Sequence, residues 1–309
     1  MQVSVIIPTY NGANKLPNIL RALAQQTFQD FETIVVVDGS TDNTIDILES
    51  GKNWGLKDFK YIVQPNVGRA KVRNRGAAEA KGDLLIFFDD DMMPFEKTVD
   101  IHHQFHQTYS NSILVGRSSQ KVDTSYPFHD FFLYRHEIEK KWYKNFNSPN
   151  FIPVGLGNYV FSTQNLSMPK NLFEQLGRFD ERLTDSEDFD LCMRAFRQNV
   201  PIYFSYEAVA WHCDFLNIEQ YIKRQVQYWH SKKKLAQLRP EYVQMHPISF
   251  QNAISPKNWK YYLKSIFIYN SFWKFITHSK AFRKLVPASL RFKIYSFIVD
   301  ASTRKIMSS

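Results

Sequence analysis

The sequence lacks the features of a disulfide-rich or membrane-spanning protein. It has 309 residues and two cysteines, Cys192 and Cys213, which are far apart and form no CxxC pair. This scarcity argues against a disulfide framework and fits a reducing compartment. No apolar run approaches the roughly 18 residues of a membrane span, and the first residues lack the basic and apolar regions of a signal peptide. We therefore expect a cytoplasmic protein.

Glycine-rich phosphate loops are missing as well. No GxGxxG follows the first apolar run, and no GxxxxGK[ST] occurs in the chain. Both motifs hold phosphates with backbone N–H groups. A nucleoside diphosphate would therefore need another anchor, such as a divalent cation bound by carboxylates.

Acidic residues are scarce in the C-terminal part of the chain. Residues 216–309 contain 17 Lys/Arg and 3 Asp/Glu, a net charge of +14, whereas residues 1–215 carry a net charge of −5. This asymmetry indicates an anionic partner for the tail, either a membrane surface or a nucleic acid. We predict an α/β domain over residues 1–215 and a basic, aromatic-rich helical extension over residues 216–309.

The first 120 residues alternate short apolar runs with segments of helical length. The runs predict strands at residues 3–7, 33–37, 61–63, 84–88 and 113–115. Helical spacing predicts helices at 16–23, 70–80, 172–179 and 188–197, and another after Pro287. This alternation predicts βαβ units and a Rossmann-like, mostly parallel, doubly wound sheet. Residues 121–164 receive no assignment.

Polar, turn-forming residues follow the predicted strands. They occupy positions 8–11, 38–40, 66–74 and 89–91. Any one of these loops could be an ordinary turn, because Gly, Asn, Asp and Ser dominate turns. Ligands of open α/β sheets bind at the carboxyl ends of the strands, so four such loops at one edge favour a ligand site.

Three adjacent carboxylates, Asp89, Asp90 and Asp91, come directly after the buried run Leu-Leu-Ile-Phe-Phe. They repel one another, and a bound Mg²⁺ or Mn²⁺ relieves that repulsion. In a continued strand, Asp89 and Asp91 would point to one side and Asp90 to the other. A solvated acidic turn is the alternative, but the position at a buried strand end favours a metal site.

Two further segments carry side chains suited to acid–base catalysis or to metal binding. Glu187 and Asp188 begin a predicted helix, where the helix dipole stabilises carboxylates and where one of them could serve as a general base. His212 follows an apolar stretch. A lone histidine is more often a core residue, although histidine is also a common ligand of borderline cations.

Six segments occur in a fixed order: 4–11 (SVIIPTYN), 37–42 (VDGSTD), 68–76 with Gly68, Arg73-Asn74 and Gly76, 87–94 (FFDDD to Pro94), 177–181 (GRFDE) and 187–191 (EDFDL). Together they resemble glycosyltransferase family 2, the inverting enzymes with the GT-A fold. The resemblance covers residues 3 to about 215. It implies transfer of one sugar from a nucleotide-diphosphate sugar, with a UDP-sugar favoured, to an acceptor hydroxyl in bacterial glycan assembly.

The resemblance also implies roles for individual residues. The residues expected to bind the donor nucleotide are Pro8, Thr9, Tyr10, Asp38, Arg73, Asp89 and Asp90. Asp91 and His212 would ligate Mn²⁺ or Mg²⁺, which would stabilise the departing diphosphate. Asp188 would be the general base, and Glu187 and Asn165 are candidate supporting or acceptor-side residues.

Two departures from the family pattern bear on the acceptor. Residues 225–229 read QVQYW, with Tyr228 where processive members carry the arginine of QxxRW, and the sequence offers no membrane span. We therefore expect one sugar to be added per encounter. Residues 156–169 resemble the family's acceptor-side loop only loosely, which leaves the acceptor open between a lipid-linked molecule and a growing glycan.

Aromatic residues alternate with lysines in the tail, as in helices that lie in a membrane interface. They are Trp259, Tyr261, Tyr262, Phe267, Trp273 and Phe275. We expect peripheral contact with an anionic membrane at the inner face of the plasma membrane. The alternative is a solvated helical face whose aromatic residues pack on the catalytic domain. No nucleic-acid partner is expected, because no recognised binding module accompanies the charge.

Two other functions stay open at this point. A nucleotidyltransferase that makes nucleotide sugars would also need a carboxylate-bound metal, but it would normally need a phosphate loop that Lys15 alone does not supply. The other possibility is a catalytically inactive module that binds a nucleotide or a sugar. The intact set Asp89, Asp91 and Asp188 argues against such decay.

Overall fold

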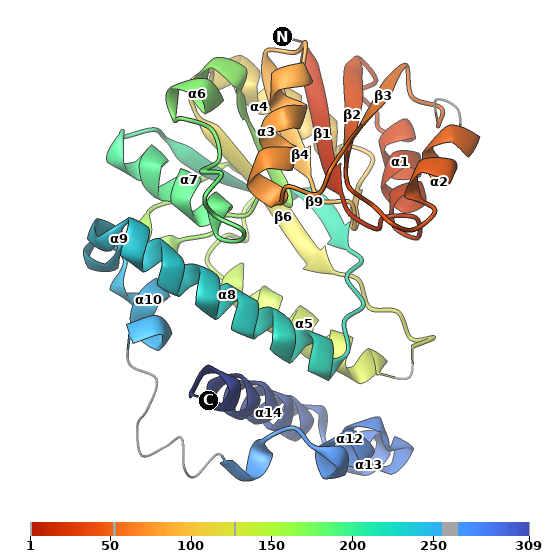
Figure 1. Cartoon of the computed structure of the whole chain (residues 1–309), viewed down its shortest axis with the longest axis vertical. Helices are drawn as coiled ribbons and strands as arrows, with labels where there is room; N and C mark the ends of the chain where they lie inside the picture. Colours follow the sequence, from red (N-terminus) through yellow and green to blue (C-terminus); the bar gives the residue numbers. More distant parts are fainter. Residues whose placement is uncertain (1, 52–53, 127, 255–264, 309) are drawn as a thin grey trace. The chain divides into compact units, whose positions relative to one another are not determined.

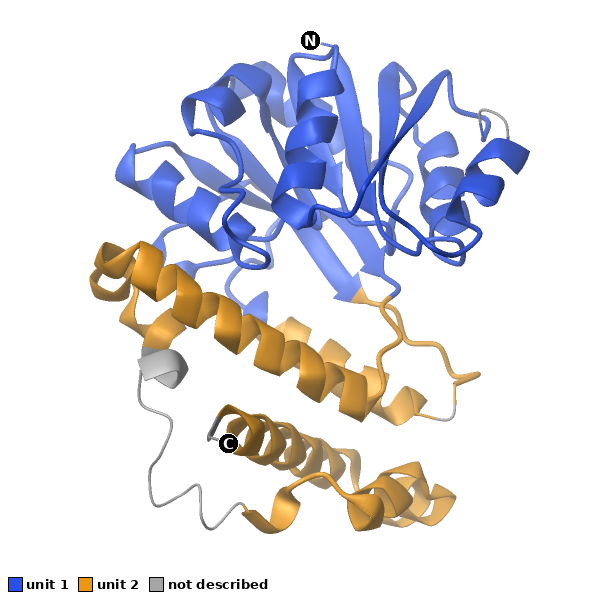
Figure 2. Cartoon of the chain, viewed as in Figure 1, with its two compact units in different colours: residues 1–119, 142–213 blue, residues 120–141, 214–309 orange. Residues whose placement is uncertain are grey.

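The computed structural model describes the whole chain except residues 1, 52–53, 127, 255–264 and 309. The chain forms two compact units (Figure 2). Unit 1 comprises residues 1–119 and 142–213, and unit 2 comprises residues 120–141 and 214–309. Residues 120–141, part of the segment that sequence patterns left unassigned, thus belong with the C-terminal helices. The predicted boundary at residues 215–216 lies close to the point where the chain enters unit 2 for the second time.

Four of the five strands predicted from apolar runs form the parallel part of the sheet in unit 1 (Figure 1), and the fifth, at residues 113–115, lies in the antiparallel part. The four parallel strands are β1 (Val3–Thr9), β2 (Phe31–Asp38), β3 (Asp58–Gln64) and β4 (Leu84–Phe88), in the order β3-β2-β1-β4. Neighbours in this row are parallel, and Asp38 pairs with Gln64 at the carboxyl end. Continuous runs of Val, Ile, Leu and Phe suit strands that are covered on both faces.

The sheet continues beyond β4 with antiparallel strands. The row is β8 (Asn165–Pro169), β6 (Ile113–Gln120), β9 (Ile202–His212) and β5 (Met92–Pro94), with β7 (Ile152–Pro153) also beside β9. β8 runs antiparallel to β4 and pairs Asn165 with Phe88. The expected acceptor-side loop at residues 156–169 therefore ends in a buried strand. Leu166 and Met168 have no exposed surface and fix this strand in the core.

Helices cover both faces of the sheet because strand side chains alternate in direction. Ile6 and Ile34 belong to the core that includes residues of α3 (Arg69–Glu79), α6 (Lys170–Gln175) and α7 (Glu187–Arg197). Val5 and Val35 belong to the opposite core, with α1 (Leu16–Ala24), α2 (Thr44–Ser50) and α4 (Thr98–Thr108). A Cβ atom on Gly76 of α3 would lie 2.5 Å from Ile6 Cγ2, so a glycine is needed for this close packing.

Unit 2 is helical. Its elements are α5 (His129–Trp142), α8 (Ile218–Leu238), α9 (Pro240–Met245), α10 (Pro247–Ile254), η2 (Ser265–Phe267), α12 (Ser271–His278), α13 (Lys280–Leu285) and α14 (Ala288–Ser308). The last residue of α5, Trp142, belongs to unit 1. α14 begins directly after Pro287, as the sequence predicted. Asp130 of α5 binds Arg291 of α14 through two contacts of 2.7 and 2.8 Å and accepts a hydrogen bond from Tyr295 Oη at 2.9 Å. In the residues that the structure describes, no helix combines the length and apolar character needed to cross a bilayer.

Candidate active site

A cavity of about 370 Å³ opens at the carboxyl ends of β1, β2 and β4 in unit 1. Its lining residues are Pro8, Thr9, Tyr10, Lys15, Asp38, Asn66, Gly68, Arg69, Val72, Arg73, Asp89, Asp90 and Asp91. The structure thus brings together all seven residues expected to contact the donor nucleotide. The volume lies within the range of about 300–1,000 Å³ that is typical of ligand pockets.

The three aspartates after β4 lie in a tight turn. Met92 donates its N–H to the carbonyl of Asp89 at 3.1 Å, which closes the turn before β5 begins. The strand therefore ends at Phe88 and does not continue through the aspartates, as the expected alternation had assumed. All three line the same cavity, and each faces a different partner.

Arg73 connects the turn after β4 with the start of α7. Its guanidinium is 3% exposed and lies 2.5 Å from both Asp89 Oδ1 and Glu187 Oε1. Burial alone would raise the pKa of Asp89, but Arg73 and Arg69 hold it below its ordinary value. Burial raises the pKa of Glu187 to about 7, against the attraction of Arg73. The pKa of Asp89 is therefore lowered and that of Glu187 is raised, although both carboxylates contact Arg73.

Asp90 faces β1 and the start of α1. Thr9 donates its hydroxyl hydrogen to Asp90 Oδ2 at 2.7 Å, and Lys15 Nζ lies 3.1 Å from Asp90 Oδ1. Burial and the neighbouring Asp91 raise the pKa of Asp90 to about 6, and Lys15 and Thr9 oppose this shift. A Cβ atom on Gly12 would lie 2.0 Å from Thr9 Oγ1, so the loop needs a glycine there.

Asp38 holds the loop that forms another wall of the cavity. It is 5% exposed and accepts hydrogen bonds from the backbone N–H groups of Val67 at 2.9 Å and Gly68 at 3.0 Å. Its carboxylate therefore positions the start of α3, where Arg69 pairs with Asp185 at 2.7 Å. Tyr10, by contrast, is about half exposed.

Lys15 and Arg69 line the cavity but were not among the predicted site residues. Arg69 is the first residue of α3, and a cation is disfavoured at a helix N-terminus by the helix dipole. That mismatch was the available signal for Arg69. Lys15 gave no comparable signal, because its approach to Asp90 depends on the turn after Gly12.

Asp91 and His212 meet because β5 pairs with β9. Met92 pairs with His212, and Cys213 donates its N–H to the Asp91 carbonyl at 2.8 Å. His212 Nε2 lies 3.6 Å from Asp91 Oδ1, a buried oxygen that accepts no hydrogen bond from any residue that the structure describes.

This pair fits a divalent cation. A carboxylate oxygen and an imidazole nitrogen are both groups that ligate divalent cations, and at a separation of 3.6 Å the two could contact one ion. Within the described residues, no group of three or more His, Cys, Asp or Glu side chains gathers to hold a metal. The protein would therefore supply two ligands and leave the other positions to phosphate oxygens and water, as Mg²⁺ sites commonly do.

Asp188 is the second residue of α7 and is half-buried. Its Oδ1 accepts a hydrogen bond from the Phe189 N–H at 2.7 Å, and its charge contributes to the raised pKa of Glu187. Ser186, just before the helix, has a φ of 66°, a conformation that non-glycine residues rarely adopt and that is often found at functional sites. In the described part of the chain, the residues that line the cavity do not include Asp188.

Asn165, a candidate acceptor-side residue, lies inside the sheet instead. It is 1% exposed, its Oδ1 lies 2.8 Å from His102 Nε2, and its Nδ2 donates to the Ala208 carbonyl at 2.8 Å. His102 Nδ1 and His106 Nε2 both contact the Ser167 hydroxyl, at 2.7 and 2.9 Å. Asn165 therefore belongs to a buried polar network between β8, α4 and β9.

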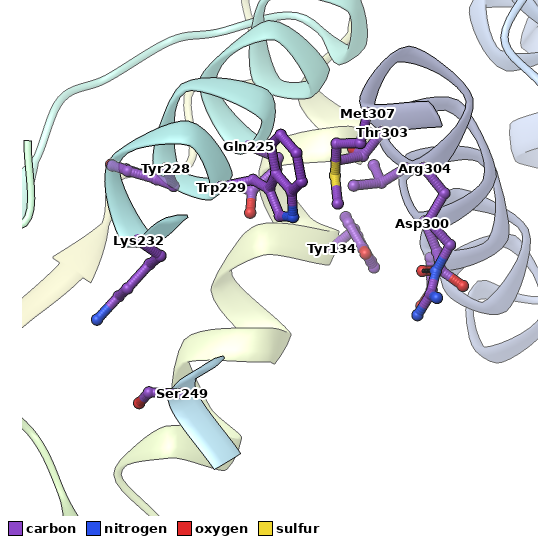
Figure 3. A pocket seen from close by; sticks show the side chains of 12 residues that line it. Tyr134, Gln225, Tyr228, Trp229, Lys232, Ser249, Asp300, Thr303, Arg304 and Met307 are labelled. Carbon is purple, nitrogen blue, oxygen red and sulfur yellow. Dashed lines mark hydrogen bonds and ion pairs between the residues drawn. The ribbon is translucent and has the colours of Figure 1, made fainter. Parts of the chain in front are cut away.

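Unit 2 contains a cavity of its own, of about 400 Å³ (Figure 3). Its walls come from α5, α8, α10 and α14, and they include Gln225, Tyr228 and Trp229 of the segment that departs from QxxRW. Arg224, just outside the lining, places its guanidinium 4.4 Å from the centre of the Tyr228 ring. None of the predicted donor, metal or base residues lines this cavity.

Comparison with solved structures gives the class of fold. The mannosyltransferase PcManGT from Pyrobaculum calidifontis, in complex with GDP-Man and Mn²⁺, aligns with a TM-score of 0.61 and 15% identity over 99% of this chain and 87% of that chain. S. aureus TarS 1-349, in complex with UDP-GlcNAc, aligns with a TM-score of 0.55 and 21% identity over 98% and 90%. The fold is thus the GT-A α/β fold, followed by C-terminal helices.

Sequence comparison gives the family. Residues 4–177, more than half of the chain, match the profile of "Glycosyl transferase family 2", and the chain belongs to this family. Validoxylamine A glucosyltransferase of Streptomyces hygroscopicus subsp. jinggangensis is 30% identical over 67% of this chain and 54% of its own length. The uncharacterized glycosyltransferase YfnE of Bacillus subtilis is 36% identical over 46% and 34%. The matched part thus spans only about a third to a half of these two relatives.

Proposed function

We propose that this protein is an inverting, metal-dependent glycosyltransferase that moves one sugar from a nucleotide-diphosphate sugar to an acceptor hydroxyl. The observation that carries the proposal is the cavity at the sheet edge. The residues predicted to bind the donor line it together with Asp91, whose buried Oδ1 accepts no hydrogen bond from the described residues and lies 3.6 Å from His212 Nε2. Membership of family 2 supports the same reaction class.

The donor would be a nucleoside-diphosphate sugar, with a UDP-sugar favoured. TarS is described with UDP-GlcNAc and PcManGT with GDP-Man, so the fold accommodates more than one base. In this chain Asp38 and the loop that it holds would form the wall against the base and ribose. The exposed ring of Tyr10 can cover one face of the base, because aromatic rings stack with a planar partner.

Asp91 Oδ1 and His212 Nε2 would hold a Mn²⁺ or Mg²⁺ ion. When bound, such an ion supplies positive charge that stabilises the departing diphosphate. Lys15 and Arg69 add fixed positive charge to the same cavity. Arg73 is engaged by Asp89 and Glu187, so we assign it the positioning of these two carboxylates.

Asp188 would take the proton of the acceptor hydroxyl as the oxygen attacks the anomeric carbon. A single displacement of this kind inverts the configuration of the sugar. The acceptor would be lipid-linked or a growing glycan. Because Tyr228 stands where processive members carry arginine, we expect one sugar per encounter, and long polymer from one primed acceptor would contradict this.

The experiment is calorimetric titration of the protein with UDP, GDP, CDP and dTDP, with and without Mn²⁺. We expect metal-dependent binding of one nucleotide that Asp91→Ala abolishes. Asp46→Ala removes an exposed aspartate of α2 outside the cavity and serves as the matched control. Metal-independent binding, or equal binding by Asp91→Ala, would overturn the metal assignment.

Turnover separates the reaction classes once the nucleotide is known. A transferase releases the nucleoside diphosphate from its sugar donor and does so faster with an acceptor. A nucleotidyltransferase would instead exchange pyrophosphate, and a binding module would do neither. Release of nucleoside diphosphate that depends on Asp188 is the result expected here.

A further inference from the structure

We propose that unit 2 docks on an anionic lipid surface through one defined region, here called the α12–α14 face. Its apolar members are Ile266, Phe272, Phe275, Leu285 and Leu290, and its basic members are Lys274, Lys280, Lys284 and Lys293. The inference rests on the proposed function only in so far as a lipid-linked acceptor would call for such contact.

The apolar members are unusually exposed. Phe275 is 74% exposed, Phe272 62%, Leu285 77% and Ile266 70%. Phe272 and Phe275 are three residues apart on α12 and therefore lie on the same side of that helix. Scattered exposed apolar residues are normal. Here they follow one another through η2, α12, α13 and the start of α14, which are consecutive in the chain (Figure 1).

The charges of the same region have one sign. Residues 265–299 contain no aspartate or glutamate, and the next acidic residue is Asp300. Lys274, Lys280, Lys284 and Lys293 are all exposed. Arg291 differs, because Asp130 compensates its charge in a buried pair. The exposed charge of this face is therefore wholly basic and complementary to anionic headgroups.

The exposed residues stand on a packed interior, so the exposure is a property of the folded unit. Phe267 stacks on Trp273 with ring centres 5.1 Å apart, and Trp273 Nε1 donates to the Ile266 carbonyl at 2.7 Å. Phe267 and Trp273, which the sequence assigned to the membrane contact, thus pack inward, while Phe272 and Phe275 take the outward positions. Trp259, Tyr261 and Tyr262 lie outside the described residues.

The composition of the face favours lipid over nucleic acid. Binding to a single strand relies on aromatic rings that stack with bases, and aliphatic side chains such as Leu285, Leu290 and Ile266 cannot do this. In a bilayer interface the same side chains enter the boundary between headgroups and acyl chains, while neighbouring lysines contact anionic headgroups. The apolar side chains of this face then contact acyl chains, and its lysines contact headgroups.

The test is co-sedimentation of the full chain with vesicles of phosphatidylcholine, with and without phosphatidylglycerol. We expect binding to the anionic vesicles only, with loss as salt rises and shortens the screening length. Phe272→Ser with Phe275→Ser should weaken binding by roughly tenfold or more, since the two exposed rings that would enter the bilayer interface are removed. Replacing the four lysines by glutamine should weaken it by about fivefold for each lysine.

A charge-matched control carries Lys57→Gln, Lys97→Gln, Lys141→Gln and Lys144→Gln, which remove four exposed lysines outside the face. It should bind anionic vesicles within about threefold of the wild type, because screened charges at a distance contribute little. Equal loss in this control would show a general charge effect and overturn the assignment of the face. Binding to neutral vesicles as well, or displacement of the vesicles by single-stranded RNA, would also overturn it.

Nucleotide calorimetry on the same variants keeps this inference separate from the proposed function. The Phe272/Phe275 variant should bind nucleotide and Mn²⁺ as the wild type does. Absence of vesicle binding with intact nucleotide binding would overturn only the docking face. Intact vesicle binding without nucleotide binding would overturn only the proposed function.

Discussion

Charged side chains are used in opposite ways at the sheet edge of unit 1 and on the α12–α14 face of unit 2. At the sheet edge of unit 1, the Arg73 guanidinium lies 2.5 Å from a carboxylate oxygen of Asp89 and 2.5 Å from one of Glu187, and the arginine is almost wholly buried. On the α12–α14 face of unit 2, the lysines are exposed, and the proposed binding to anionic lipid depends on their total charge. Charges of the first kind depend on position, whereas charges of the second kind are screened by salt. Substitutions of charged residues should therefore have large, site-specific effects at the sheet edge of unit 1 and small, additive ones on the α12–α14 face.

The largest effect is expected at Asp188. Asp188→Asn removes the proposed base but keeps the size of the side chain and its contact with the Phe189 N–H. Turnover should fall by about 10²–10⁴-fold, the usual contribution of general base catalysis. Initial rates of nucleoside diphosphate release, with calorimetry of the nucleotide alongside, measure this. A fall in rate that merely follows a loss of nucleotide binding would contradict the role.

Arg73→Leu tests the buried charges of unit 1 through stability. It leaves Asp89 and Glu187 without their shared cation, and removal of one partner from a buried ion pair costs about 3–5 kcal/mol. Urea unfolding followed by circular dichroism measures the change. Arg75→Leu, which removes an exposed arginine of the same helix paired with Glu79, is the matched control and should cost under about 1 kcal/mol. An equal loss of unfolding free energy in the two variants would contradict the contrast between buried and exposed charges.

Acid should destabilise unit 1 through its buried histidines. Burial lowers the pKa of His102 from 6.5 to about 4 and that of His106 from 6.5 to about 3. The unfolded chain therefore binds these protons first, so their contribution is complete above pH 6.5 and is lost as the pH falls toward 4. One fully buried imidazole with such a shift accounts for ~3 kcal/mol. Urea unfolding at a series of pH values measures this. Between pH 6.5 and pH 4, the free energy of unfolding should fall less steeply in His102→Gln than in the wild type.

The smallest effect is expected on the α12–α14 face. Lys274→Gln and Lys280→Gln should each change the free energy of unfolding by less than about 0.5 kcal/mol, since exposed charges contribute little. Urea unfolding at low and high salt measures this. A change above 1 kcal/mol would mean that these lysines stabilise the fold, and the contrast between the units would be weaker than described.

Sequence patterns predicted most of the parallel part of the sheet because β1, β2 and β4 are buried on both faces. Val3 to Ile7 and Leu84 to Phe88 read as continuous apolar runs, and the polar residues after them had to meet at one edge. The direction of Asp90 was not predictable, because it depends on a turn closed by the Met92 N–H. The burial of Asn165 was not predictable either, because its place in a polar network depends on its partner His102, which is distant in the sequence.

The position of residues 120–141 was also beyond sequence patterns. Their place in unit 2 rests on contacts with distant residues, such as Asp130 with Arg291 and Arg135 with Asp214 at 3.1 Å. Lys15 belongs to the same class, since Asp90 follows it by 75 positions. Local spacing identifies strands and helices, whereas these pairings require the folded chain.

The contact of Arg73 with Glu187 joins residues 114 positions apart in the chain. Because the guanidinium also contacts Asp89, one side chain of α3 links the turn after β4, where the proposed donor and metal residues lie, to the start of α7, which carries the proposed base. This link does not run through residues 121–164, so exposed positions of that stretch, away from the core residues Phe146, Val154 and Phe161, can change to suit new acceptors while the contacts of Arg73 stay the same.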